Sequence, residues 1–326
     1  MGRHRYDLFV NVPPHGPMLY PEHPKGPVRM RRSRRIILVA ALLAASASAT
    51  GCQIETPQPA LSEVVGNMTF VATSYQSAVR YGSLAHQDAV VYLSSAPKKL
   101  GVIVYFPGGG FVGVDPHGAS TDPYVRRALW RGYDVMSVRY ATTGRTMAQV
   151  NAGPPSNPVF VQATLDASTA IGYAQTSPLF ANHSNIVAVG WSAGGGLAAL
   201  EASMGGDRGW NLPNKVLAFA GVLDCRGDSE FTWQSCQELT GQRVSALGTV
   251  ASYLDDSDPP MYVVQSPDDP IIDPVVAQRV FDHATQVGAS VTLDRTDGYL
   301  TGEPMVGCGH GPQACANATE IDAFTG

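Results

Sequence analysis

The sequence has few charged residues and, after its first fifty residues, no cluster of positive charge. Asp, Glu, Lys and Arg together make up 15% of the 326 residues. Residues 1–52 contain eight Lys or Arg and two Asp or Glu, which leaves 14 basic and 25 acidic residues, a net charge of −11, on residues 53–326. Such a surface repels a phosphate backbone. Because no basic cluster follows Arg35, the sequence predicts no nucleic-acid partner.

The apolar run that begins at Ile36 is too short for a membrane-spanning helix. It extends for about 14 residues, whereas a span needs roughly 20. Five arginines between Arg29 and Arg35 precede it, and a Ser/Ala segment follows it. This order is typical of a bacterial export signal. The sequence therefore predicts a leader in residues 1–52, a single folded domain in residues 53–326, and a location in the bacterial cell envelope, in the periplasm or outside the cell.

The sequence is compatible with two kinds of cleavage at the end of this leader. Residues 49–52, with the sequence Ala-Thr-Gly-Cys, resemble a lipoprotein box, in which Cys52 becomes the lipidated first residue of the mature chain. Ordinary signal-peptidase sites at residues 45–47 and 47–49 compete with it. A lipidated Cys52 is the one form of membrane attachment that we expect.

Cysteine is scarce. Apart from Cys52 the chain has four, Cys225, Cys236, Cys308 and Cys315. An even number suits two disulfides outside the cytoplasm, and four cysteines allow three connectivities. Pairing by proximity gives Cys225–Cys236 and Cys308–Cys315. Neither pair has the C-x-x-C spacing of a zinc site, so we expect no metal.

Predicted strands and helices alternate along the chain from about residue 89. Apolar runs predict strands at 89–93, 101–106, 133–139, 186–189, 215–220, 261–265 and 290–293, and amphipathic or small-residue segments predict helices at 122–131, 160–175, 193–204 and 274–287. This alternation is typical of an α/β fold, a doubly wound and mostly parallel sheet with helices on both faces. Two stretches interrupt it, 141–158 and 225–259, and we expect both to lie at the carboxyl edge as walls of a ligand crevice.

Ser192 lies in the sequence Gly-Trp-Ser-Ala-Gly at residues 190–194, between a predicted strand and a predicted helix. A G-x-S-x-G pentapeptide in this context places the serine on a sharp turn that exposes its hydroxyl. The helix behind it directs its first amides, beginning with Ala193, toward the same point. Ser192 is therefore the candidate nucleophile.

A serine nucleophile needs a base and a carboxylate that orients the base. Three aspartates follow the strand at 261–265, namely Asp268, Asp269 and Asp273, and two histidines follow these, His283 and His310. His283 falls in the middle of a predicted helix, which suits a surface residue. His310 is flanked by Gly309 and Gly311 in a loop, which suits a side chain that must reach Ser192.

Three consecutive glycines, Gly108, Gly109 and Gly110, follow the strand at 101–106. Without Cβ atoms their backbone N–H groups can approach a ligand closely. They are candidates for binding an oxygen that gains negative charge.

From about residue 100 to residue 311 these motifs resemble those of the α/β-hydrolase superfamily, and in particular the hormone-sensitive-lipase-like esterases and related carboxylesterases. The resemblance selects Asp269, which is followed by Pro270, as the acid of a triad with Ser192 and His310. It implies that the amides of Gly109, Gly110 and Ala193 form the oxyanion hole. Two positions differ, since Pro107 replaces a usual His and Trp191 replaces a common Asp.

The resemblance implies a serine hydrolase that cleaves carboxylic esters through an acyl-enzyme and needs no metal or organic cofactor. An acidic exported enzyme with little room for an N-terminal cap suits small, short-chain or polymer-borne esters. Two alternatives are open: an amidase or peptidase of the same fold, and a binding lipoprotein that has the hydrolase fold without catalysis.

Overall fold

The computed structural model describes residues 74–227, 229–295, 309–311, 316 and 318–326. Within these residues the chain forms one eight-stranded sheet with the order β1-β2-β4-β3-β5-β6-β7-β8. The strands are β1 (Ser74–Arg80), β2 (Asp88–Leu93), β3 (Gly101–Phe106), β4 (Tyr133–Val138), β5 (Ile186–Trp191), β6 (Lys215–Phe219), β7 (Met261–Val264) and β8 (Val291–Asp294). β1 and β2 are antiparallel to their neighbours and all other pairs are parallel.

The central strands are buried on both faces. Every residue of β3 and β4 is buried, and β5 is buried as far as Gly190. Continuous runs of Val and Ile suit strands of this kind, because side chains on both faces meet apolar neighbours. In the parallel register Val104 of β3 lies opposite Met136 of β4 and Ala188 of β5. These three strands form the rigid base on which the loops at their carboxyl ends stand.

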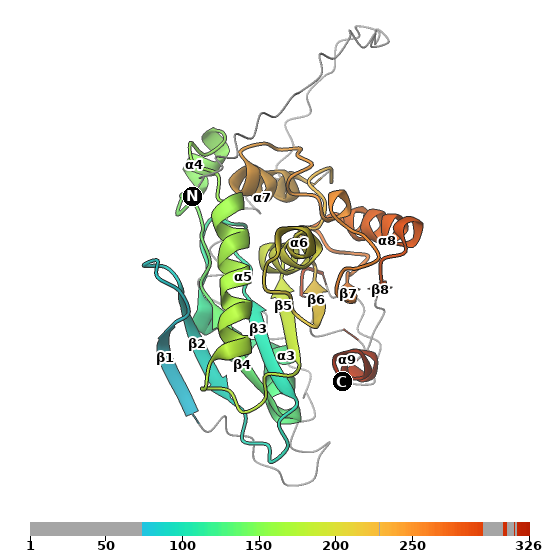
Figure 1. The fold of residues 1–326 in the computed structure, drawn as a ribbon. Helices are drawn as coiled ribbons and strands as arrows, with labels where there is room; N and C mark the ends of the chain where they lie inside the picture. The colour runs from blue at the N-terminus through green and yellow to red at the C-terminus, as the bar shows by residue number, and fades with distance from the viewer. Residues whose placement is uncertain (1–73, 228, 296–308, 312–315, 317) are drawn as a thin grey trace, which may run out of the picture. The chain divides into compact units, whose positions relative to one another are not determined.

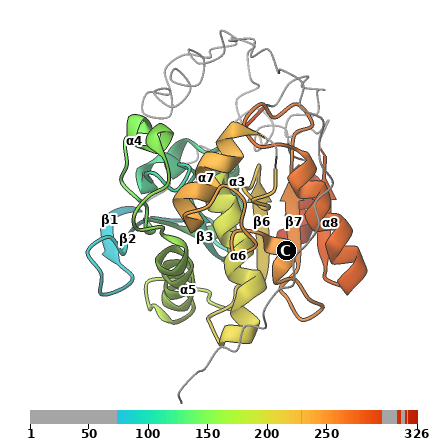
Figure 2. The same ribbon diagram turned by 90° about the horizontal axis from the view of Figure 1, so that it is seen from above.

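Helices cover both faces of the sheet (Figures 1 and 2). α5 (Phe160–Thr176), α6 (Ala193–Arg208) and α8 (Val275–Val287) contribute to one buried apolar cluster, and α3 (Pro123–Arg131) and α9 (Ala318–Thr325) contribute to the other. Local signals set the ends of α3. The Asp122 carboxylate accepts the N–H groups of Tyr124 and Val125, and Gly132 ends the helix in the left-handed region at φ 111°.

This architecture confirms the predicted fold class, a doubly wound and mostly parallel sheet between two layers of helices. Each predicted strand and helix is present within a few residues of its expected bounds. The two interrupting stretches, 141–158 and 225–259, contain helices that the sequence analysis did not predict. The first contains α4 (Met147–Ala152), and the second contains α7 (Glu230–Thr240) and the 3₁₀ helix η2 (Val250–Ser252). The prediction also missed β1, α9 and a second 3₁₀ helix, η1 (Pro116–Thr121).

α4 and α7 lie side by side at the end of the molecule where the parallel strands finish (Figures 1 and 2). Both have defined starts. Thr146 and Gln149 form a reciprocal capping box at the start of α4, and the Ser229 hydroxyl accepts the N–H of Thr232 at the start of α7. The Gln237 side chain then donates to the carbonyl oxygen of Val150 at 3.3 Å, which joins the two helices.

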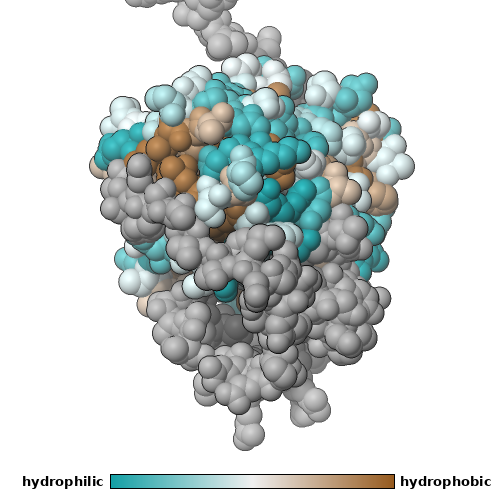
Figure 3. Space-filling model, turned by 90° about the horizontal axis from the view of Figure 1, so that it is seen from below, coloured by the Kyte–Doolittle hydropathy of each residue, from teal (hydrophilic) through white to brown (hydrophobic). Residues whose placement is uncertain are grey.

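A disulfide joins Cys225 to Cys236, with their Cα atoms 5.5 Å apart, which confirms this pairing by proximity. Cys308 and Cys315 lie outside the described residues, as do Cys52 and the predicted leader. Among the residues that the structure describes, no helix is long and apolar enough to cross a membrane. On the face shown in Figure 3 the described surface is mostly hydrophilic, with hydrophobic residues gathered in a small area.

Candidate active site

Ser192 occupies the turn between β5 and α6, in a backbone conformation that L-residues rarely adopt. Its φ and ψ are 55° and −124°. Its N–H donates to the carbonyl oxygen of Phe219 at 2.9 Å, so the neighbouring strand β6 holds the turn. The residue is 3% exposed. The strained turn between a strand and a helix is as the sequence predicted, but the predicted exposure of the serine is not observed, because residue 192 is buried.

The glycines around Ser192 are required by close backbone contacts. A Cβ atom on Gly190 would lie 2.2 Å from the carbonyl oxygen of Gly194, and one on Gly194 would lie 1.9 Å from that of Phe106. Both distances are far below van der Waals contact. The turn is therefore packed backbone against backbone, both on itself and on the end of β3.

His310 and Asp269 are hydrogen-bonded to each other. His310 Nδ1 lies 2.9 Å from Asp269 Oδ2 and 3.2 Å from Oδ1. The Asp269 side chain is fully buried and also accepts the N–H groups of Ile271 at 2.8 Å and Ile272 at 3.0 Å. The side-chain amide of Gln265 also donates to Oδ2, at 3.1 Å, so four N–H donors converge on one buried carboxylate and fix its orientation. With Nδ1 engaged, Nε2 is the ring nitrogen left for proton transfer.

Trp191 joins His310 to the serine turn. Its indole Nε1 donates to the carbonyl oxygen of His310 at 2.8 Å, and the two rings lie 5.3 Å apart between centroids. On another side the ring of Phe231 in α7 meets the imidazole edge to face at 6.4 Å. Because Trp191 directly precedes Ser192, these contacts join residues 309–311 to the residue before the serine. The Trp that departs from the esterase pattern therefore anchors the histidine loop.

The two competing aspartates have other partners. Asp268 accepts hydrogen bonds from the Ser266 hydroxyl and from the N–H of Gly309 at 3.2 Å, and the Ser266 hydroxyl lowers the pKa of the Asp268 carboxyl. Asp273 accepts the N–H of Val275 at 3.0 Å at the start of α8. His283 lies in the middle of α8, as expected. Asp269 is thus the aspartate of the three whose carboxylate contacts the His310 ring.

The glycine loop after β3 packs directly on the serine turn. A Cβ atom on Gly108 would lie 3.1 Å from Cβ of Ser192. Gly109 and Gly110 have φ values of 144° and 61°, and a Cβ on Gly109 would lie 1.8 Å from the carbonyl oxygen of Gly113. Among the described residues, the backbone N–H groups of Gly109, Gly110 and Ala193 have no hydrogen-bond acceptor. These are the three amides that the sequence assigned to an oxyanion hole.

Phe111 extends this loop in a left-handed conformation that costs a non-glycine residue free energy, with φ 59°. Its ring is fully buried and meets Tyr140 edge to face at 6.2 Å. The Tyr140 hydroxyl donates to the carbonyl oxygen of Pro107 at 2.6 Å, and the Thr143 N–H donates to that of Phe111 at 2.9 Å. The segment after β4 therefore holds the glycine loop in its strained form.

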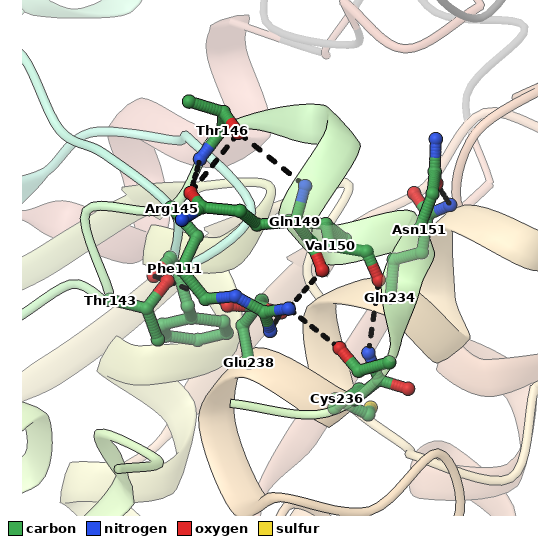
Figure 4. Close-up of polar contacts among 12 residues, drawn as sticks. Phe111, Thr143, Arg145, Thr146, Gln149, Val150, Asn151, Gln234, Cys236 and Glu238 are labelled. Carbon is green, nitrogen blue, oxygen red and sulfur yellow. Dashed lines mark hydrogen bonds and ion pairs between the residues drawn. The ribbon is translucent and has the colours of Figure 1, made fainter. Parts of the chain in front are cut away.

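A buried ion pair fixes that segment in turn (Figure 4). The Glu238 carboxylate of α7 has no exposed surface and accepts from Arg145 Nη1 and from the Thr143 hydroxyl, each at 2.6 Å. Arg145 also donates to the carbonyl oxygens of Gln149 and Gly153. The guanidinium and carboxylate thus clamp the ends of α4 onto α7. A buried pair with this many additional hydrogen bonds is of the kind whose charges are compensated in the folded state.

Comparison with known proteins found likeness in structure alone. No family model matches the sequence, and no curated protein does. A truncated carbohydrate esterase from gut microbiota superposes with a TM-score of 0.62, at 16% identity over 78% of this chain and 95% of its own. The esterase Est2 of Thermogutta terrifontis gives a TM-score of 0.55 at 19% identity, over 78% and 89% of the two chains. A carboxylesterase from Lactobacillus plantarum gives 0.55 at 16% identity, over 72% and 90%.

The chain has the α/β-hydrolase fold. The order of the strands reverses at β3, which lies between β4 and β5. Ligands of doubly wound sheets bind outside the carboxyl ends of the strands at such a switch point. Gly108 to Gly110 follow β3 and Ser192 follows β5. The fold therefore places the glycine loop and the serine turn together.

A cavity of about 460 Å³ lies along residues 141–158, lined by Thr143, Arg145, Gln149, Ala152, Pro154, Pro155, Ser156 and Asn157. Its lining includes none of Ser192, Asp269 and His310, so it lies beside the site. Within the described residues no group of three His, Cys, Asp or Glu side chains could hold a metal ion.

Sequence reasoning missed several residues that support the site. The roles of Phe231, Glu238 and Arg145 depend on contacts between residues far apart in the chain. The capping-box pattern at Thr146 and Gln149, and the Ser229 that precedes α7, are signals that could have revealed the two helices on which these side chains lie.

Proposed function

We propose that this protein is a serine carboxylesterase that hydrolyses esters of short carboxylic acids through an acyl-enzyme on Ser192. The observation that carries the proposal is the hydrogen bond from His310 Nδ1 to the buried Asp269 carboxylate, in a loop that Trp191 ties to the serine turn. A buried carboxylate that orients an imidazole beside a strained serine is the arrangement of serine hydrolases.

In the first half of the proposed reaction the Ser192 hydroxyl oxygen attacks the ester carbonyl carbon. His310 Nε2 accepts the hydroxyl proton and then gives it to the departing alcohol. Asp269 stays ionised, holds the Nδ1 proton and stabilises the imidazolium that forms. In the second half water attacks the acyl-enzyme with His310 again as base, which releases the carboxylic acid and restores Ser192.

The negative charge that develops on the carbonyl oxygen needs preorganised donors. We assign this role to the backbone N–H groups of Gly109, Gly110 and Ala193. Their lack of other acceptors among the described residues supports the assignment, since donors that are already directed at the charge need no reorganisation during the reaction. No metal or organic cofactor is needed for these steps.

The structural neighbours support small acyl groups. Est2 has been solved with propionate and with butyrate bound, and two other neighbours are a carbohydrate esterase and a bifunctional GH43-CE protein of Bacteroides eggerthii. We therefore propose short-chain esters, free or carried on a polymer, as substrates. The disulfide favours an exported protein, and we propose that the leader directs export and that Cys52 is the lipid attachment site.

The test is hydrolysis of p-nitrophenyl esters of two to twelve acyl carbons by the full chain and by its Ser192→Ala variant. We expect hydrolysis that is fastest with short acyl groups and is lost in the variant. Ser203→Ala is the matched control. Ser203 is a buried serine of α6, the helix that follows Ser192, and its hydroxyl donates to the carbonyl oxygen of Leu200.

Three outcomes contradict parts of the proposal. A maximum at long acyl groups contradicts the substrate class. Hydrolysis of p-nitroanilides in preference to esters points to an amidase. If neither substrate reacts and a fluorophosphonate does not label the folded protein, the hydrolase fold serves binding.

A further inference from the structure

Helix α7 turns one face toward the glycine loop. Phe231, Ser235 and Glu238 are spaced i, i+4 and i+7, which places them on one side of a helix. Each is close to this loop or its support. A Cβ atom on Gly110 would lie 3.4 Å from Cζ of Phe231 and 3.6 Å from Oγ of Ser235, and Glu238 bonds to the Thr143 that holds Phe111. The face as a whole is a wall of the proposed oxyanion hole.

Ser235 is the residue of this face whose polar side-chain atom has no hydrogen-bond partner within the described structure. It is 1% exposed, and its hydroxyl oxygen is buried without any hydrogen-bond partner. Phe231 packs on His310 and Glu238 binds Arg145 and Thr143. A buried hydroxyl without a hydrogen-bond partner destabilises the fold. A bound molecule could supply the partner that the free protein lacks.

The surroundings of this hydroxyl indicate which group that is. A Cβ atom on Gly110 would lie 3.6 Å from this hydroxyl oxygen, and the N–H groups of Gly109, Gly110 and Ala193 have no acceptor among the described residues. Ser235 therefore places a hydroxyl donor beside Gly110, one of the three residues whose amides have no acceptor within the described residues. An oxygen atom that carries negative charge satisfies such a set, because an oxyanion accepts several hydrogen bonds at once.

We propose that the Ser235 hydroxyl is a further donor to the oxyanion of the tetrahedral intermediate. The inference rests on the proposed esterase function and adds a side-chain donor to its three backbone amides. The position of Ser235 is fixed by two residues that follow it in α7, since Cys236 is bonded to Cys225 and Glu238 is clamped by Arg145. A donor held in this way is preorganised for charge that appears in the transition state.

The experiment compares the full chain with Ser235→Ala, using p-nitrophenyl acetate, a boronic acid that mimics the tetrahedral intermediate, and thermal unfolding. We expect kcat to fall about tenfold with KM little changed, because the contact is made in the transition state. Binding of the boronic acid weakens by a similar factor. The melting temperature stays equal or rises, because an unpaired buried hydroxyl has been removed.

Ser137→Ala is the matched control. Ser137 in β4 is also fully buried with an unpartnered hydroxyl, and it lies on the face of the sheet that α3 covers. We expect its removal to leave kcat and boronic acid binding unchanged. In Ser235→Ala we expect kcat to fall without a loss of melting temperature, whereas in Ser137→Ala kcat should not fall. This difference separates a catalytic contact from an effect on packing.

Three results overturn the role of Ser235: an unchanged kcat, a rise in KM alone, or a loss of kcat that is matched by a loss of melting temperature. Failure of the esterase function has a different signature. In that case the unsubstituted protein and Ser192→Ala hydrolyse the ester equally, which overturns both the function and the contact.

Discussion

The serine turn and the glycine loop lie against each other, yet different parts of the chain hold them in strained conformations. At residues 190–196 the backbone holds the strain, because glycines without Cβ atoms let the turn pack on itself and on β3, and the Ser192 N–H donates to β6. At residues 107–113 it is held from outside, by Tyr140, Thr143 and the Arg145–Glu238 pair. Two turns of one site thus differ in whether backbone atoms or side chains hold them.

This difference predicts how strongly substitutions in each of the two turns should disturb the structure. A change in the serine turn meets backbone atoms, which cannot move aside without disturbing the sheet. A change in the support of the glycine loop meets side chains that can rearrange, so its effect is graded. Four substitutions test or refine the comparison.

The largest effect is expected for Gly194→Ala. The new Cβ atom would lie 1.9 Å from the carbonyl oxygen of Phe106 and 2.6 Å from that of Pro107, so either β3 or α6 must shift. We expect more than about 4 kcal/mol of destabilisation and no labelling by a fluorophosphonate. Gly206→Ala in the same helix is the control, since nothing lies within 4 Å of its Cβ position. It should gain about 0.5–1 kcal/mol.

Asp269→Asn comes next, because the amide preserves the shape of the side chain and removes its charge. We expect kcat for ester hydrolysis to fall about 10³- to 10⁴-fold, since the histidine then loses its orienting carboxylate. The Oδ1 atom still accepts the N–H groups of Ile271 and Ile272, so the melting temperature should change little. Asp273→Asn is the control and should keep full activity. Equal losses in the two variants would remove Asp269 from the triad.

Glu238→Gln tests whether the Arg145–Glu238 ion pair supports the glycine loop. It leaves the Arg145 guanidinium, whose side chain is 16% exposed, without its carboxylate, which should cost about 3–5 kcal/mol of folding free energy. Because Thr143 and then Phe111 lose their anchor, kcat should fall about ten- to a hundredfold. A double variant, Glu238→Met with Arg145→Met, leaves no buried charge and should recover stability in urea unfolding. Unchanged kcat in Glu238→Gln would show that the glycine loop holds its own shape.

The smallest effect on activity is expected for Glu201→Met, on the same helix as the serine turn. The Glu201 carboxyl is fully buried with both oxygens unpartnered, and burial raises its pKa well above the ordinary 4.5. Above pH 4.5 the folded state keeps a proton that the unfolded state loses, so this carboxyl lowers stability progressively as pH rises. Unfolding in urea from pH 5 to pH 8 should show Glu201→Met gaining up to about 1.4 kcal/mol per pH unit over the unsubstituted protein.

Asp207→Asn, an exposed change on the same helix, should show no such dependence on pH. A constant difference between Glu201→Met and the unsubstituted protein across the pH range would mean that Glu201 is ionised in the folded state. Unchanged kcat in Glu201→Met would show that the serine turn is independent of the helix interior.

The sequence could predict features that depend on contiguous residues, and it could not predict contacts between residues far apart in the chain. β3, β5 and the serine turn were predictable because their apolar runs and glycines are contiguous. Asp269 and His310 were harder, since three aspartates competed and the choice depended on resemblance to a family. The Arg145–Glu238 pair joins residues 93 positions apart, and the Ser235 hydroxyl beside Gly110 joins residues 125 positions apart. No pattern within a short window encodes such contacts, because topology creates them.

The disulfide has a consequence for when the site becomes complete. It joins the loop after β6 to α7, the helix that places Phe231 beside His310 and Ser235 beside Gly110. Cytoplasmic reductants oppose such a bond, and an oxidising compartment allows it. Covalent fixation of this wall is therefore a maturation step that depends on where the chain folds, and a newly made chain reaches its final rigidity after it has met an oxidant.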